Sequence, residues 1–398
     1  MNKKTITDIS LANKRVFMRA DFNVPLNENG EITDDIRIVE ALPTIKHILN
    51  EGASLVLSSH MGRPKGEVNS KFSLKPVAEH LAQLLNTSVI LAKDCIGLEV
   101  KMQKEALLPG QILLLENVRF HKEETENNAD FAKELINGCD LFVNDAFGTA
   151  HRAHASTTGV ASFVEHSVSG FLIEKELKFL GNAVNAPERP FTAIIGGAKI
   201  SGKIDVILQL FDKVDTIIIG GGMIFTFYRA LGMEIGKSLV EEDKVELAKE
   251  ILNKAKEKNT RIYLPTDVVC ADSFSNDATT EICPSGALHP EMMGLDIGPS
   301  SIETVSGILS GSKTVIWNGP MGAFEMPNFA KGTEAVAKTL AEITKTGATT
   351  IVGGGDSAAA VKSLNLSKEL SHVSTGGGAS LEFLEGKILP GIAALSDK

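Results

Sequence analysis

The sequence predicts an α/β protein of two doubly wound, parallel-sheet lobes of the Rossmann type, joined by a helical hinge. Three observations support this fold class. Short runs rich in Val, Ile and Leu alternate with longer stretches of helical period, which is typical of parallel strands linked by crossover helices. The chain has 398 residues, more than one hydrophobic core ordinarily holds. A helical segment also separates two series of predicted strands.

Strands are expected where aliphatic and β-branched residues cluster between helical stretches. In the first lobe these segments are 15–22, 53–59, 88–92, 111–117 and 141–146. In the second lobe they are 191–196, 216–220, 261–265, 314–318, 350–354 and 372–375. Helices are expected to fill the intervals, so that each lobe forms its own layered core.

The connecting segment 171–190, FLIEKELKFLGNAVNAPERP, has the period of an amphipathic helix and ends in a proline-containing break. We therefore expect residues 1–172 to form the first domain, 173–190 a hinge helix and linker, and 191–384 the second domain. A helical connector keeps two lobes in a defined relation while allowing closure, which a Gly/Ser tether does not do.

Composition excludes several classes of protein. A hydrophobic content of 43% with 23% charged residues describes a globular chain, not a disordered one. The net charge of −10 argues against nucleic acid or an anionic membrane as the main partner, because both bind clustered positive charge. The N-terminal segment MNKKTITDISLANKR has no apolar region of a signal peptide, and no apolar run reaches membrane-spanning length. The sequence predicts a cytoplasmic protein.

The four cysteines show no spacing typical of a metal or redox motif. Cys95, Cys139, Cys270 and Cys283 are far apart in sequence, and no C-x-x-C occurs. We interpret them as reduced thiols in the core or near the surface.

Arginine is concentrated in the first lobe, which holds six of the nine arginines. Four of these lie at or just beyond predicted strand ends: Arg37, Arg63, Arg119 and Arg152. Because ligands of parallel α/β sheets bind outside the carboxyl ends of the strands, these four are expected to converge on one crevice. Guanidinium groups suit carboxylates and phosphates. The predicted ligand is a small anion with several negative charges.

Other polar residues occupy the same strand ends. Asp21 and Asn23 lie at the end of the first strand and His60 follows the second. A carboxylate does not help to bind phosphate, so Asp21 is expected to accept a hydrogen bond from a ligand hydroxyl. His151 and His154 would share one face of a helix, but no third metal ligand has suitable spacing. We favour a loop histidine that orients or neutralises an anion.

Glycine distinguishes the second lobe. Glycine clusters follow four predicted strands, at 196–197, 220–222, 353–355 and 376–378. Glycine at a strand end permits positive φ and lets backbone N–H groups approach phosphates, while the next helix adds its partial positive charge. This pattern predicts a nucleotide site.

Two segments of this lobe resemble named motifs. In LGMEIGKS (231–238), Leu231 stands where the P-loop pattern requires glycine, so we reject a P-loop. GGGDSA (353–358) matches the dinucleotide pattern G-x-G-x-x-A, but Asp356 would repel a pyrophosphate unless a divalent cation lay between them. Mg²⁺ bridging Asp356 and nucleotide phosphates resolves this conflict.

The segment GGAKISGKI (196–204) places Lys199 and Lys203 four residues apart at the expected start of a helix, where they would share a face. Cations at this end oppose the helix dipole, so their placement favours a functional role. A phosphoryl group in transfer, with charge spread over its oxygens, would be stabilised by both ammonium groups.

Taken together, these motifs resemble those of the phosphoglycerate kinase family along essentially the whole chain. The matching segments, in the family's order, are RADFNVP, HMGRPKG, ENVRFHKEE, DAFGTAHRAHAST, GGAKISGKI, IWNGPMGAFE, GGGDS and STGGGAS. The resemblance implies a monomeric kinase of glycolysis and gluconeogenesis. It would transfer a phosphoryl group reversibly between MgATP and the carboxylate of 3-phosphoglycerate, giving 1,3-bisphosphoglycerate and ADP. The resemblance also implies that the first domain binds 3-phosphoglycerate, the second binds nucleotide, and a C-terminal tail, about 385–398, packs back on the first.

The resemblance assigns roles to matching residues. Asp21 and Asn23 would hold the glycerate, and Arg37 would reach the carboxyl and the transferring group. The substrate phosphate would bind His60, Arg63, Arg119 and Arg152. Lys199, Lys203 and backbone donors at Gly376 would stabilise the transferred group, with Asp356 as the Mg²⁺ ligand. The nucleotide would contact Gly196, Gly197, Lys203, Gly220, Gly294, Asn318, Pro320, Gly353, Gly354, Gly355, Asp356 and Ser357, with Glu325 on the ribose.

An ionised carboxylate acceptor needs no general base, because phosphoryl transfer depends on positioning and charge neutralisation. Closure of the lobes would bring the substrates in line and exclude water.

Two residues depart from the family pattern: Gly202 replaces an acidic residue, and Met61 replaces leucine. Within a helix, Gly202 would weaken the placement of Lys203 by roughly 1 kcal/mol relative to Ala. Activity is still expected.

Two alternative functions stay open at this point. A nucleotide-dependent dehydrogenase would need an acidic ribose ligand about 20 residues beyond the glycines of GGGDSA, where Ser374 and Thr375 stand. A non-catalytic binding protein could close its two lobes on an anion. Replacing Lys203 by Ala separates a kinase from a binder, because only a kinase has turnover to lose.

Overall fold

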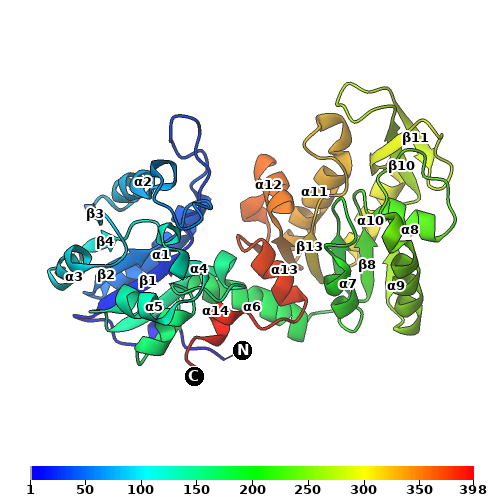
Figure 1. Ribbon diagram of the computed structural model, residues 1–398. Coiled ribbons are helices and arrows are strands. Elements are labelled where there is room, and N and C mark those ends of the chain that lie inside the picture. Colours follow the sequence, from blue (N-terminus) through cyan, green and yellow to red (C-terminus); the bar gives the residue numbers. More distant parts are fainter. Residues whose placement is uncertain (1) are drawn as a thin grey trace. The chain divides into compact units, whose positions relative to one another are not determined.

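The computed structural model describes residues 2–398, which form two compact units (Figure 1). The first unit comprises the chain up to Lys178 together with Ile388–Lys398, and the second comprises Phe179–Lys387. The change from one unit to the other falls inside helix α6 (Phe171–Asn185). Among the described residues, no helix has the length and apolar character needed to cross a membrane.

A six-stranded parallel sheet in the order β3-β4-β2-β1-β5-β6 forms the centre of the first unit. Its strands are β1 (Arg15–Ala20), β2 (Ser54–Ser58), β3 (Val89–Leu91), β4 (Ile112–Leu114), β5 (Leu141–Asp145) and β6 (Ser167–Ser169). The chain extends the sheet from β1 toward β3 and then returns to add β5 on the other side of β1. The point where the strand order reverses therefore lies between β1 and β5, where α/β proteins bind ligands.

Helices cover both faces of this sheet (Figure 1). They are α1 (Ile36–Asn50), α2 (Lys75–Leu85), α3 (Leu98–Glu105), α4 (Lys122–Thr125), α5 (Ala129–Ile136) and α14 (Pro390–Ala393), with the short 3₁₀ turns η1 (Ile6–Asp8), η2 (Ser70–Phe72), η3 (Val118–Phe120), η4 (Phe147–Thr149) and η5 (Gly159–Phe163). Alternate residues of β1 enter different clusters: Met18 packs with Ile45 of α1, and Phe17 packs with Leu135 of α5. Full burial of such side chains contributes about 1.5–3 kcal/mol each, which holds the sheet between its helical layers.

The C-terminal tail completes the first unit. Gly391 N donates to Ala150 O at 2.8 Å, and Ser396 N donates to Ser167 O at 2.8 Å. The terminal residues also lie beside the N-terminal segment, where Lys3 Nζ is 2.8 Å from an Asp397 carboxylate oxygen. These bonds tie the tail to the segment after β5 and to β6.

The second unit has its own six-stranded parallel sheet, in the order β15-β14-β13-β7-β8-β9. Its strands are β7 (Phe191–Ile195), β8 (Thr216–Ile219), β9 (Arg261–Tyr263), β13 (Thr314–Asn318), β14 (Thr349–Gly353) and β15 (His372–Val373). The strand order reverses between β7 and β13, where Ile195 pairs with Asn318. This is the crevice position of a doubly wound sheet.

The remaining elements of the second unit are helices around this sheet and a smaller sheet. The helices are α7 (Ile204–Leu210), α8 (Ile224–Ala230), α9 (Val245–Glu257), α10 (Pro299–Ser310), α11 (Lys331–Lys345), α12 (Gly355–Ser363) and α13 (Gly378–Leu384), with η6 (Glu242–Lys244), η7 (Pro327–Phe329) and η8 (Ser367–Glu369). An antiparallel sheet in the order β11-β10-β12 is formed by β10 (Asp267–Ala271), β11 (Thr280–Pro284) and β12 (Met293–Ile297).

The predicted fold class of two parallel α/β regions is confirmed. Every predicted strand is present, 314–318 with the predicted bounds and the others with shorter or shifted ends. Strand β6 and the antiparallel sheet were not expected from the sequence. Strand β6 is only Ser-Val-Ser, and β11 is largely exposed, so neither has the apolar run that identifies a buried strand.

Candidate active site

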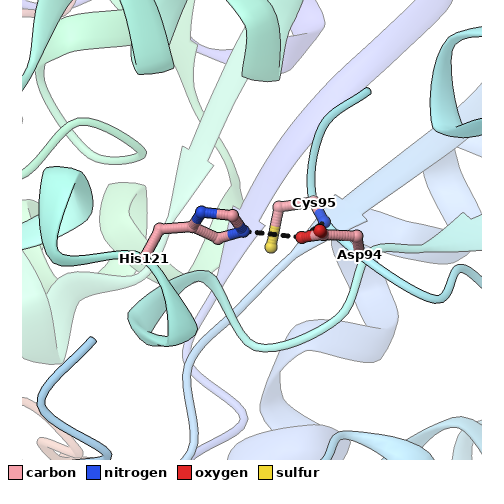
Figure 2. Close-up of side chains that lie close together, drawn as sticks. All are labelled: Asp94, Cys95 and His121. Atoms are coloured by element: carbon pink, nitrogen blue, oxygen red, sulfur yellow. Dashed lines mark hydrogen bonds and ion pairs between the residues drawn. The ribbon is translucent and has the colours of Figure 1, made fainter. Parts of the chain in front are cut away.

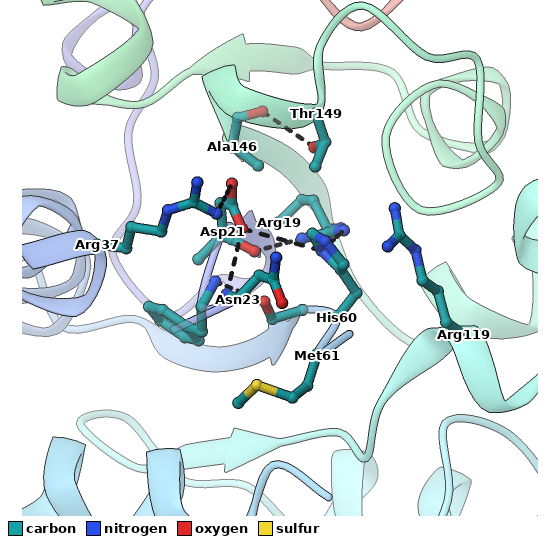
Figure 3. A network of polar contacts seen from close by, with 12 residues as sticks. Arg19, Asp21, Asn23, Arg37, His60, Met61, Arg119, Ala146 and Thr149 are labelled. Atoms are coloured by element: carbon teal, nitrogen blue, oxygen red, sulfur yellow. Dashed lines mark hydrogen bonds and ion pairs between the residues drawn. The ribbon is translucent and has the colours of Figure 1, made fainter. Parts of the chain in front are cut away.

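A polar network occupies the carboxyl ends of β1 and β2 in the first unit (Figure 3). Arg37 Nη1, from the first turn of α1, donates to Asp21 Oδ2 at 2.9 Å. The second oxygen, Asp21 Oδ1, accepts from Asn23 N at 3.2 Å, and Asn23 Oδ1 accepts from Gly62 N at 2.8 Å. The loops after the two strands are therefore joined to each other through the Asn23 side chain.

His60 lies in this network as a buried, neutral imidazole. Arg19 Nη2 is 3.1 Å from His60 Nδ1. A guanidinium can only donate, so Nδ1 is the acceptor and Nε2 carries the ring proton. Burial lowers the pKa of His60 well below its usual value, and the charges of Arg19, Arg119 and Arg37 lower it further. The ring thus offers an N–H donor without adding a charge.

Arg19 was not singled out by the sequence analysis, although the structure makes it a central buried charge. Its side chain is 0% exposed, and its Nε donates to Ser156 Oγ at 2.8 Å. Ser156 Oγ in turn donates to Glu124 Oε1 at 2.6 Å, and Ser156 N donates to Glu124 Oε2 at 2.9 Å. Glu124 is also 0% exposed. The position of Arg19 within the segment RVFMRADF, directly after three apolar residues, was the available signal, because a charge on a central strand needs a buried partner.

Three of the predicted arginines line one pocket of 350 Å³. The lining residues are Arg63, Lys65, Gly66, Arg119, His121, Lys122, Thr125 and Arg152. Arg119 Nη1 donates to Gly62 O at 2.9 Å, so Gly62 links this pocket to Asn23 of the polar network. Burial, together with the nearby Arg19 and Arg152 charges, lowers the pKa of Arg119 to about 10. The pocket holds excess positive charge and is suited to an anion.

The predicted residues of the first unit thus fall into two adjoining groups. Asp21, Asn23, Arg37 and His60 share the polar network, and the other three arginines share the pocket. Residues 151–154 form a turn and a loop, so His151 and His154 do not share a helical face, and both lie in a loop as favoured from the sequence. Burial lowers the pKa of His154 to about 4, assisted by Arg119, so this ring is also neutral.

In the second unit, glycines at the switch point have a packing requirement of their own. A Cβ on Gly196, just after β7, would lie 2.1 Å from Pro320 O. A Cβ on Gly319, just after β13, would lie 2.2 Å from Gly196 O, and Gly319 has φ +98°. Gly220 after β8 is confined in the same way, with Met321 Sδ 2.5 Å from a Cβ position. These loops approach so closely that only glycine fits.

Lys203 and Asn318 meet at this switch point, where Lys203 Nζ donates to Asn318 Oδ1. Burial lowers the pKa of Lys203, while the carboxylates of Asp356 and Glu385 oppose that effect. Ser357 is fully buried and its Oγ accepts from Gly319 N at 2.6 Å, which joins α12 to the loop after β13.

The expected helix start at Lys199 is wrong. Helix α7 begins at Ile204, Lys203 is its N-cap, and Lys199 is exposed in the preceding bend. The two lysines therefore do not share a helical face. Gly202 lies in the turn 201–203 rather than inside a helix, so the expected propensity cost to Lys203 does not apply. A Cβ on Gly202 would meet nothing within 4 Å.

Asp356 is exposed in the first turn of α12, which follows the left-handed N-cap Gly354. An exposed carboxylate near the free N–H groups of a helix start fits a divalent cation that is shared with phosphate oxygens. Helix α13 begins in a comparable way after Gly377, with φ +52°, and Gly376 N donates to Ser374 Oγ at 3.0 Å.

Two predicted nucleotide residues lie in less expected surroundings. Gly294 belongs to β12 of the antiparallel sheet, where a Cβ would lie 2.2 Å from the Phe225 ring. Its N–H donates to Ser238 Oγ at 2.9 Å. Glu325 is exposed in the turn that follows Met321 and Gly322.

The chain is similar to one family throughout. The sequence model of the family described as Phosphoglycerate kinase matches residues 6–387. Relatives named phosphoglycerate kinase from Chlorobium phaeobacteroides (strain BS1) and Chlorobaculum tepidum are each 59% identical over 397 residues, covering 100% of both chains. A solved phosphoglycerate kinase from Coxiella burnetii matches with a TM-score of 0.90 and 44% identity, covering 98% of each chain. One from Pyrococcus horikoshii OT3 matches with a TM-score of 0.84 and 30% identity, also over 98% of each chain.

Proposed function

The chain belongs to the phosphoglycerate kinase family, and on this premise we propose which of its residues perform the reaction. It is a phosphotransferase of glycolysis that interconverts ATP and 3-phosphoglycerate with ADP and 1,3-bisphosphoglycerate. The dehydrogenase and binding-protein alternatives are not favoured, since the full-length relatives are named as kinases.

The phosphate of 3-phosphoglycerate is proposed to bind in the pocket lined by Arg63, Arg119 and Arg152, with His60 as a neutral donor. The single observation that carries this proposal is the crowding of cations, which lowers the pKa of Arg119 to about 10 through burial and neighbouring arginines. A dianion would relieve that repulsion. Charge-assisted hydrogen bonds to guanidinium groups contribute about 1.5–3 kcal/mol each.

The glycerate end of the substrate is proposed to bind Asp21, Asn23 and Arg37. Asp21 is 8% exposed, and one of its oxygens is engaged by Arg37 at 2.9 Å. A substrate hydroxyl can donate to Asp21, while a substrate carboxylate competes with Asp21 for the Arg37 guanidinium. Arg37 would then neutralise charge on the carboxylate that attacks phosphorus.

Transfer itself is proposed to depend on Arg37, Lys199, Lys203 and the backbone N–H groups near Gly376. The carboxylate oxygen forms a bond to the γ-phosphorus while the bond from phosphorus to the β,γ-bridging oxygen of ATP breaks. ADP leaves with the electron pair, and no proton needs to move. Negative charge spreads over the equatorial oxygens, so fixed cations and N–H donors lower the barrier. The lowered pKa of Lys203 accompanies its burial, which strengthens its field on a bound anion.

The nucleotide is proposed to occupy the switch point of the second sheet. Its proposed contacts are Gly196, Gly197, Lys203, Gly220, Gly294, Asn318, Pro320, Glu325 and residues 353–357. Asp356 is proposed to hold Mg²⁺ together with the phosphates, and this cation would neutralise phosphate charge. The exposed position of Asp356 in the first turn of α12 supports that role.

We further propose that the enzyme acts as a cytoplasmic monomer and that closure about the segment 173–190 brings its two substrates together. The two substrates are assigned to different units, so transfer requires them to meet with water excluded. The change of unit inside α6 supports a connector in this segment.

A coupled assay tests this proposal by measuring ADP formation from ATP. We expect turnover only with 3-phosphoglycerate and only with a divalent cation, and Asp356→Asn should raise the Mg²⁺ concentration needed for half-maximal rate. Glu325→Gln serves as a control, because it removes an acidic group assigned to the ribose and not to the metal. ADP formation that depends on neither 3-phosphoglycerate nor Mg²⁺ would contradict the proposed reaction.

A further inference from the structure

Three potential metal-ligating side chains meet beside the proposed phosphate pocket, which His121 also lines, and the proposed function uses none of the three (Figure 2). They are Asp94 and Cys95, which follow β3, and His121, which follows η3. One ligand atom from each residue lies within 4.8 Å of the other two. His121 Nε2 is 2.6 Å from Asp94 Oδ1, and Cys95 Sγ donates to Glu116 O at 2.9 Å. Among residues 2–398, this is the one group of three such side chains with this spacing.

The three residues offer one sulfur, one nitrogen and one oxygen ligand, and this combination favours some cations over others. A thiolate and an imidazole suit a borderline or soft cation such as Zn²⁺, and a carboxylate completes three protein ligands. Mg²⁺ and Ca²⁺ prefer oxygen ligands and would not use the sulfur. We propose that Asp94, Cys95 and His121 form a binding site for Zn²⁺ or a similar thiophilic divalent cation, with a fourth position left for water or an anion.

The geometry needs only modest adjustment to accept the ion. Tetrahedral Zn²⁺ with bonds of about 2.0 Å to nitrogen and oxygen and 2.3 Å to sulfur separates N and O by about 3.3 Å, and S and N by about 3.5 Å. The present N···O separation of 2.6 Å must widen, and all three ligand atoms already lie within 4.8 Å of one another. The Asp94 and His121 side chains are 52% and 24% exposed, so both can move while buried Cys95 forms the floor.

Binding exchanges protons for the metal. The Cys95 thiol gives up its proton to solvent and its weak S–H hydrogen bond to Glu116 O, and the thiolate sulfur bonds to the cation. His121 moves its ring proton to Nδ1, so that the Nε2 lone pair replaces the present contact with Asp94 by a metal bond. Asp94 contributes one oxygen, and the oxidation state of every group stays the same.

A purely structural role for the contact between His121 and Asp94 can be distinguished from metal binding. The chain contains a second His–Asp contact, His80 Nε2 to Asp35 Oδ2 at 2.9 Å, in which no cysteine takes part. If the 94–121 contact merely joins two loops, both His–Asp pairs should behave alike toward metals. Under the proposal, only the pair that includes Cys95 binds a thiophilic cation.

Co²⁺ is the probe for the test, added to the full chain without nucleotide or phosphate. We expect a thiolate-to-cobalt charge-transfer absorption that saturates at one ion per chain and disappears when Zn²⁺ displaces Co²⁺. Cys95→Ser should abolish the band, and His121→Gln should raise the dissociation constant for Zn²⁺ at least tenfold. Cys139→Ser controls for another thiol, and His80→Gln controls for a His–Asp pair without sulfur; neither should change binding.

The proposal is overturned if the charge-transfer band is absent, or if it survives in Cys95→Ser. Thermal unfolding without metal shows whether each variant folds like the parent. If Cys95→Ser does not fold, His121→Gln decides, because unaltered Zn²⁺ affinity in that variant also overturns the proposal. Metal bound at Asp356 gives no thiolate band, so the result does not depend on the proposed Mg²⁺ site.

Discussion

Replacement of Arg19 by Met tests the buried network that supports the anion site. Methionine approximates the length of the arginine side chain but removes its charge and its donors. Ser156 Oγ then loses the hydrogen bond from Arg19 Nε, and His60 Nδ1 loses its contact with Arg19 Nη2. Glu124 is left as a fully buried carboxylate without the nearby guanidinium charge.

The expected cost follows from the burial of both charged groups. Removing one member of a buried charge pair typically costs 3–5 kcal/mol, because the other charge is left uncompensated. Ser156 still donates two hydrogen bonds to Glu124, from its N–H at 2.9 Å and its hydroxyl at 2.6 Å. The loss should therefore lie near the lower end, at about 3 kcal/mol. Adding Glu124→Gln removes the uncompensated charge and should recover about 1 kcal/mol or more.

Urea unfolding followed by far-UV circular dichroism reports the loss of secondary structure in both units, so the change in the first unit is found by comparison with a probe confined to the second. Trp317 is the one tryptophan of the chain and lies in the second unit, so its fluorescence provides an internal reference. The double-mutant cycle requires Arg19→Met, Glu124→Gln and the combination. If the combination is no more stable than Arg19→Met alone, the two charges are not coupled and the reasoning fails.

Four further predictions follow from the proposed site. Lys203→Ala should lower kcat by about 10²–10³ while leaving the dissociation constant for 3-phosphoglycerate nearly unchanged, and near-normal kcat would remove Lys203 from the transfer step. Arg119→Ala should raise the KM for 3-phosphoglycerate at least tenfold without a matching change for ATP, whereas Arg15→Ala, at the other end of β1, should change neither. Burial raises the pKa of Asp145 to about 7 from 3.8, so the folded protein holds a proton that the unfolded chain releases, and stability should fall as pH rises through this window. Asp145→Asn should flatten that dependence in pH-resolved thermal unfolding, and an unchanged profile would contradict it. Gly355→Ala should preserve stability, because a Cβ at this position meets no protein atom within 4 Å. The same substitution should weaken ATP binding, because the added methyl group would occupy space that the nucleotide is proposed to approach; unchanged ATP affinity would argue against that close approach.

The sequence reveals those features that recur with a regular period or at a fixed place in the topology. Buried parallel strands appear as apolar runs, and side chains at their carboxyl ends meet because the strands are parallel. This reasoning predicts that Asp21, His60 and Arg119 lie in one region. It failed for the antiparallel strand β11, whose exposed residues carry no apolar run.

Contacts between distant segments account for the remaining omissions. Cys95 follows β3 and His121 lies beyond the end of β4, and the pairing of these two strands brings the residues together. No local sequence motif predicts that contact. The pairing of Arg19 with Glu124 depends on Ser156 lying between them, which a strand pattern cannot specify. The helix start was misplaced because Ile200 O accepts from Lys203 N at 2.8 Å, which closes a turn before α7 begins.

Glycine at strand ends combines two separate requirements that a sequence pattern cannot distinguish. Gly196 and Gly319 exclude a side chain because each faces the other's backbone across the switch point, whether or not a nucleotide is bound. Gly355, in contrast, has negative φ and open space at its Cβ position. Neither backbone conformation nor packing within the protein therefore requires glycine there. A ligand that must approach the first turn of α12 would supply such a need. A glycine therefore indicates a nucleotide site best where the packing of the folded chain would accept a larger residue, because there only a ligand explains the missing side chain.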